Sequence, residues 1–303
     1  MNYAQLLLPD FLVILCGYLV CRYTALNRSV WSQVDSLVYY FLFPTLLFHS
    51  IMRSPLDLGT AFPMIAGAWL LCLSGIGLTY SLPRWPVLGR YVARRDHASA
   101  AQVAFRFNSF IALAVAERVG GAQGLLLMAI IVGVCVPLLN VGAVWPMARH
   151  AERGLLRELA RNPLVIATSS GLACNLLGLR IPEWIQPTVT RIGSAAIVLG
   201  LLAAGAGLQL GGLLRSRMLS VALLSLRHLW LPLIAWGLGL ALRLPPEQAM
   251  VLLVFASVPT ASSCYVLAPR MGYDGAYVAG LVTVSTLLGM FSLPFALGIL
   301  RGG

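Results

Sequence analysis

The sequence predicts an all-α polytopic membrane protein, and three observations support this. Of its 303 residues, 59% are hydrophobic and only 10% are charged, whereas soluble domains are about 45–50% apolar. Apolar runs recur along the whole chain, each about 20 residues long and so able to cross a hydrocarbon core of about 30 Å. Most of the arginines lie between these runs, singly or in pairs. A soluble globular domain is therefore excluded.

The apolar runs divide into ten predicted transmembrane spans. They cover residues 5–23, 33–52, 61–83, 98–117, 122–147, 160–180, 188–212, 218–242, 247–270 and 275–300. Arginines are concentrated in the loops after odd-numbered spans, for example at 84–95 and 149–157. Because cytoplasmic loops carry the excess of positive charge, these loops are predicted to be cytoplasmic. Both termini are then predicted to lie outside the cytoplasm.

The formal net charge of +11 comes from 21 arginines, with no lysine, against ten acids. In a soluble chain this balance would suggest nucleic acid, but here it is better explained by orientation in the bilayer, so no nucleic-acid partner is expected. The six cysteines have no metal-ligand spacing. No hydrolase, metalloprotease or phosphate-loop motif is present. We therefore expect no metal, no cofactor and no enzymatic activity.

The two halves of the chain look like copies. In Leu6–Leu19, Pro9 precedes Gly17 by the same spacing with which Pro163 precedes Gly171 in the later run ARNPLVIATSSGLA. The predicted repeats are residues 1–148 and 149–303, with five spans each. An odd number of spans forces the second repeat into the opposite orientation, and inverted repeats are the architecture of many secondary transporters. Such transporters bind substrate near the midplane, where helices are interrupted.

The fourth span of each half is the candidate for such an interruption. Aligning Val119-Gly120 with Met271-Gly272 places Asn108 opposite Thr260. Pro259 lacks an amide hydrogen and frees backbone groups in mid-span, for which the neighbouring hydroxyls are partners. Asn108 can compete for backbone hydrogen bonds more weakly. If both spans unwind and cross, their half-helix N-termini would favour an anion.

Arg106 strengthens the case for an anion. A central intramembrane arginine costs several kcal/mol on insertion scales, so it should face a cavity or a partner. A carboxylate would pair bidentately with its guanidinium group. The alternatives are that Arg106 reaches the cytoplasmic surface or pairs with Asp35. The candidate substrate-binding residues are Arg106, Asn108, Ser109, Pro259, Thr260, Ala261, Ser262, Asn140 and Pro44.

Weaker candidates concern ion coupling. His49 could titrate in a proton-coupled cycle, although an interfacial histidine is the commoner explanation. Asp35 is the acid best placed to face the interior. The tenth span carries hydroxyls that could coordinate an ion or bond their own helix, namely Thr283, Ser285 and Thr286. The small residues around Gly207-x-x-x-Gly211 indicate close helix packing, with a homodimer interface as one option.

Several motifs together resemble the auxin efflux carrier family of bacterial and plant transporters. They are FLFPTLLF in span two, FRFNSFIALAVAERVGG in span four, VPLLN in span five, ELARNPLVIATSSGL opening the second half, and SVPTASSCYVLAPRMGYD in span nine. The resemblance implies ten spans in two inverted repeats, with helices 4 and 9 broken and crossing at the substrate site. It implies a scaffold of helices 1, 2, 6 and 7 and a moving transport core of helices 3–5 and 8–10, often in a dimer.

Function follows from the same resemblance: secondary transport of a small organic anion such as auxin, malate or malonate, by an elevator cycle, in a bacterial inner membrane. The family often has proline at both crossings, and this chain has it only in span nine. The alternatives are a sodium-coupled symporter of the bile-acid type and a membrane receptor that binds without transporting. The bile-acid symporters use an acid in the ninth span for sodium, and here Gln248–Arg270 contains none.

Overall fold

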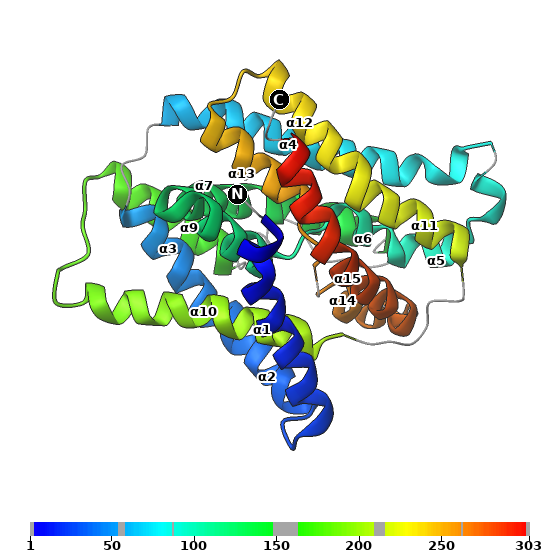
Figure 1. Cartoon of the computed structure of the whole chain (residues 1–303), viewed down its shortest axis with the longest axis horizontal. Helices are drawn as coiled ribbons and strands as arrows, with labels where there is room; N and C mark the ends of the chain where they lie inside the picture. The colour runs from blue at the N-terminus through cyan, green and yellow to red at the C-terminus, as the bar shows by residue number, and fades with distance from the viewer. Residues whose placement is uncertain are drawn as a thin grey trace.

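The computed structural model describes residues 3–53, 58–86, 88–147, 163–208, 216–261 and 263–300, and within these ranges its regular elements are all helices (Figure 1). The predicted boundary between the repeats, Ser262 and Gly211 lie outside the described residues. Six of the described stretches are long and apolar enough to cross a membrane. The chain is thus a helical membrane protein with several spans, while the count of ten and the inverted repeat remain predictions.

The α-helices are, in chain order, α1 Tyr3–Tyr23, α2 Arg28–Leu37, α3 Phe43–Arg53, α4 Leu58–Ser81, α5 Arg94–Ala100, α6 Gln102–Phe105, α7 Ser109–Met147, α9 Pro163–Leu176, α10 Gln186–Ala206, α11 Arg217–Ser225, α12 Leu231–Ala241, α13 Pro246–Ser257, α14 Cys264–Arg270 and α15 Gly275–Leu300. Two short 3₁₀ turns follow α4, namely η2 Leu82–Arg84 and η3 Leu88–Tyr91. α7 contains a turn at Gly121, whose φ of 60° lies in the region that favours glycine. This turn separates the predicted fourth and fifth spans.

Two π-helical turns widen the backbone just before a proline. The turn η1, Val38–Leu42, joins α2 to α3 and precedes Pro44, and η4, Leu226–Trp230, joins α11 to α12 and precedes Pro232. A proline has no N–H and its ring clashes with the carbonyl one turn earlier. The wider turn accommodates this without ending the helix. Such π-turns are frequent at functional sites.

The helices pack in two groups (Figure 1). α1, α2, α3, α9 and α10 lie together, with α1 along α10 and α3 along α9, while α4 and α11–α15 lie on the other side. α7 contacts both groups. Asp10 of α1 and Arg118 of α7 form a bidentate ion pair, with oxygen–nitrogen distances of 2.8 and 2.9 Å. Neither residue was among the candidates proposed from the sequence.

The contact of α1 with α10 depends on a glycine. A Cβ built on Gly17 would overlap the backbone carbonyl of Leu202, whereas a Cβ on Gly77 of α4 would meet nothing within 4 Å. We expect Gly17→Ala to destabilise the protein by about 1–3 kcal/mol, because a backbone neighbour cannot move aside as a side chain can. Gly77→Ala should be neutral or stabilising by up to about 1 kcal/mol. Thermal unfolding of both variants in the same detergent checks this, and equal midpoints would contradict it.

Candidate functional site

The fourth and ninth predicted spans are both interrupted, and the interruptions meet. α6 ends at Phe105 and α7 begins at Ser109, while α13 ends at Ser257 and α14 begins at Cys264. The backbone N–H of Asn108 donates to the carbonyl of Pro259 at 2.9 Å. We call the described residues of these two interruptions, 106–108, 258–261 and 263, the crossover. The polar backbone of each break therefore lies against the other rather than against lipid.

Asn108 explains how span four breaks without a proline. It is buried, and its side-chain oxygen accepts hydrogen bonds from the backbone N–H groups of Phe110 at 3.1 Å and Ile111 at 3.2 Å. This is N-capping of α7, which replaces the helical bonds that the first turn lacks. The side-chain oxygen of Asn108 is thus engaged in the fold, and its amide NH2 group is what it can offer to a ligand.

Arg106 lies at the crossover with four side-chain partners, the most distant of which is Sγ of Cys264, 4.0 Å from Nη1. Nη1 donates to Oε1 of Gln102 at 2.9 Å, and Nη2 donates to Oδ1 of Asn140 at 3.1 Å and to Oγ of Ser263 at 2.9 Å. The arginine is half-buried and Ser263 is exposed. These partners orient the guanidinium group without neutralising its charge. The positive charge is therefore held in place at the break and within reach of solvent.

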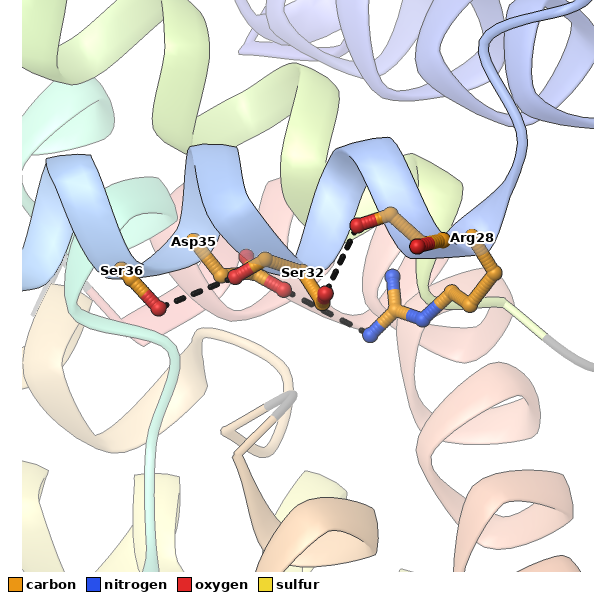
Figure 2. Close-up of polar contacts among 5 residues, drawn as sticks. Arg28, Ser32, Asp35 and Ser36 are labelled. Carbon is orange, nitrogen blue, oxygen red and sulfur yellow. Dashed lines mark hydrogen bonds and ion pairs between the residues drawn. The ribbon is translucent and has the colours of Figure 1, made fainter.

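Asp35, the predicted alternative partner of Arg106, is paired elsewhere. Its Oδ2 lies 3.5 Å from Nη2 of Arg28 in the same helix, along the face of α2 that also carries Ser32 and Ser36 (Figure 2). The carbon at the centre of the Arg28 guanidinium lies 5.0 Å from the centre of the Tyr265 ring, so this face of α2 contacts α14 by a cation–π interaction.

The second side of the crossover is the interruption in span nine. There the backbone of Thr260 forms a hydrogen bond with α15. Its N–H donates to Oγ of Ser285 at 3.0 Å, and that hydroxyl lies 2.9 Å from Nε2 of His228. Nδ1 of the same ring lies 2.8 Å from Oγ of Ser292. Ser285, proposed from the sequence as a coupling residue, is thus part of a hydrogen-bond chain that ends at the crossover.

The remaining candidates are distributed more widely. Ser109 is the half-buried first residue of α7, and Pro259, Thr260 and Ala261 are buried in the crossover. Pro44 lies next to Phe43, whose ring packs on that of Phe110 just after Asn108. His49 is buried, and its Nε2 lies 3.4 Å from Oγ1 of Thr190 in α10. Thr283 and Thr286 donate to carbonyls of their own helix.

Three residues at the crossover were not proposed from the sequence. Gln102 is one helical turn before Arg106, and the i, i+4 spacing could have identified it. Arg227 and His228 lie in the middle of an apolar span, and the rule that intramembrane ionisable residues are functional hypotheses could have identified both. Arg227 donates to backbone carbonyls of Phe255 and Val258.

A cavity of about 390 Å³ lies at the start of α5, lined by Arg95, Asp96, Ser99 and Gly272–Asp274. Ser99 connects it to the crossover, because the backbone carbonyl of Ser99 accepts a hydrogen bond from Nε2 of Gln102 at 3.0 Å. Gln102 also accepts from Arg106. Ser99 and Gln102 of α5 and α6 therefore form a chain of hydrogen bonds between this cavity and Arg106.

Comparison with known proteins settles the class of protein. The sequence model of a family described as "Membrane transport protein" matches residues 117–297, more than half of the chain and including the second side of the crossover. The chain belongs to this family, the auxin efflux carrier family of transporters. It is therefore a membrane transporter, as the motifs indicated.

Two relatives extend the similarity over most of the chain. A protein of Rhizobium meliloti (strain 1021) named "Putative malonate transporter" is 23% identical over 319 residues, covering 98% of this chain and 96% of the relative. The "Uncharacterized transporter YfdV" of Escherichia coli (strain K12) is 24% identical over 279 residues, 87% of each chain. The similarity to these transporters therefore includes the first side of the crossover.

Proposed function

We propose that the protein is a secondary active transporter of a small organic anion carrying a carboxylate, by efflux or exchange. One observation carries the proposal: the guanidinium of Arg106 is held at the crossover by Gln102, Asn140 and Ser263, which are all neutral. A charge fixed in this way is complementary to an anion. Arg28 pairs with Asp35 and Arg118 pairs with Asp10, and neither of these ion pairs uses Arg106.

The surroundings of Arg106 support a carboxylate rather than a cation. The described crossover residues include no acid, and the partners nearest to the arginine are amides and a hydroxyl. An arginine binds a planar carboxylate through two parallel hydrogen bonds. The relative named for malonate supports a dicarboxylate as the first substrate to try.

The packing of the helices supports an elevator cycle with a scaffold and a transport core. Gly17 of α1 lies against α10, and Gly171 of α9 lies against α3. Each glycine lies in the first span of one predicted repeat and contacts the second span of the other repeat. A pseudo-two-fold axis between the two repeats would produce this pair of equivalent contacts. We assign α1, α2, α3, α9 and α10 to the scaffold and the helices of the crossover to the moving core, in a bacterial inner membrane with both termini outside the cytoplasm.

Counterflow in proteoliposomes tests the proposal directly. Vesicles containing the purified protein and unlabelled malonate should accumulate labelled malonate above the level of empty vesicles, because exchange through one site needs no net driving force. A panel of monocarboxylates, dicarboxylates and neutral amides should compete only where a carboxylate is present. Saturable binding of malonate without counterflow would instead indicate a receptor. Absence of both binding and flux for every carboxylate in the panel would contradict the proposal.

A further inference from the structure

Arg227 has the most buried charge that the described residues show, with 1% of its surface exposed. It lies in the π-turn η4, and its guanidinium points at the end of α13. Nε donates to the carbonyl of Val258 at 2.8 Å, and Nη2 donates to the carbonyls of Phe255 at 3.0 Å and Val258 at 2.6 Å. Its charge is thus directed at backbone oxygens of the crossover rather than at an acid.

The C-terminus of α13 is stabilised by a positively charged hydrogen-bond donor. A helix leaves up to four carbonyls without an intrahelical partner at its C-terminus, and these carry a partial negative charge of about half a unit. α13 ends inside the protein at Ser257 because Pro259 follows. Ser257 and Val258 are buried, so a cation is the natural partner for the carbonyls at this end. Carbonyl oxygens converging in this way are also the ligands that hard metal cations take.

We propose that Arg227 is a built-in cation of the crossover, which takes the place of a bound metal cation at the carbonyl end of α13 and makes transport independent of sodium. The proposal rests on the proposed function and deepens it by specifying how the site is coupled. The neighbouring titratable group in η4 is His228, whose ring nitrogens are bonded to Ser285 and Ser292 of α15. Arg227 is a positioning residue: it holds the end of α13, on which Pro259 and its bond to Asn108 depend.

A matched pair of variants isolates the charge. Arg227→Lys keeps a positive charge on a long side chain, and Arg227→Met has a similar length without charge. We expect Arg227→Met to lower carboxylate flux by about 10- to 100-fold and Arg227→Lys to retain part of it, since bonds from charged donors are among the stronger ones. Arg180→Ala, at an exposed arginine, is the control and should transport like the wild type. Wild-type flux should be the same in sodium and in choline buffers.

A second measurement does not depend on transport. We expect methylguanidinium to raise the thermal unfolding midpoint of Arg227→Ala and to leave that of the wild type unchanged, because only the variant has room for it at the carbonyls. A wild-type flux that requires sodium, or equal behaviour of the Lys and Met variants, would overturn the proposal. If the wild type shows no carboxylate flux at all, the proposed function fails, and the methylguanidinium experiment still decides the role of Arg227: no stabilisation of Arg227→Ala would refute it.

Discussion

Replacing Arg106 with glutamine is expected to reduce carboxylate flux by about 100-fold or more, because the substrate loses a charge-assisted bidentate partner. Glutamine keeps a neutral hydrogen-bonding amide at this position, but it is shorter than arginine and does not reach as far as Nη2. The effect should appear mainly as weaker binding, measured as a higher half-saturating concentration of malonate in counterflow. A thermal shift with malonate should show the same loss without the need for vesicles.

Two controls separate loss of the charge from loss of the fold. Arg106→Lys keeps the charge but not the planar fork, and we expect it to bind carboxylates more weakly than the wild type and more tightly than Arg106→Gln. Arg22→Gln removes an exposed arginine at the end of α1 and should leave flux unchanged. If Arg106→Gln transported malonate at the wild-type rate, the anion would have to bind elsewhere. A lower unfolding midpoint without ligand would point to misfolding.

The break in span nine could be predicted from the sequence because its cause is local. Pro259 removes a donor wherever the rest of the fold places it, and α13 does end just before it, at Ser257. The break in span four has a weaker signal in the sequence, because this chain lacks the second proline. Its cause is also local, however: the side chain of Asn108 caps α7 within one turn. In this chain the asparagine therefore marks the break in span four as the proline marks the break in span nine.

The partners of Arg106 could not be predicted in the same way. Asn140 and Ser263 lie far from it along the chain, and only the tertiary fold brings them to its guanidinium group. Asn140 is a candidate from the sequence because it is an amide in an apolar span, but a sequence does not say which polar groups meet. The same holds for Arg227, whose partners are backbone carbonyls. Such carbonyls leave no signal in the side-chain pattern, so the bond that holds the end of α13 was not foreseen.

Asn108 caps α7 in the structure and is proposed to bind substrate through its amide. Replacing it with serine separates these two roles. Serine is as good an N-cap as asparagine, so Asn108→Ser should keep the unfolding midpoint of the wild type. Asn108→Ala removes the cap and should cost about 1 kcal/mol of stability. If the amide NH2 group of Asn108 binds substrate, both variants should lose carboxylate flux by about tenfold, the usual worth of one hydrogen bond to a charged group.

The comparison of the two variants decides the role of this residue. Flux that follows stability, with Asn108→Ser normal and Asn108→Ala impaired, would show that Asn108 only caps α7 and that Arg106 binds the anion without it. Flux lost in both variants, with stability lost only in Asn108→Ala, would place the amide in contact with substrate. We expect the second result, because the cap uses only the side-chain oxygen and leaves the amide NH2 group to donate to an anion at the crossover. Hydrogen-bond donors at that point add to the same anion site.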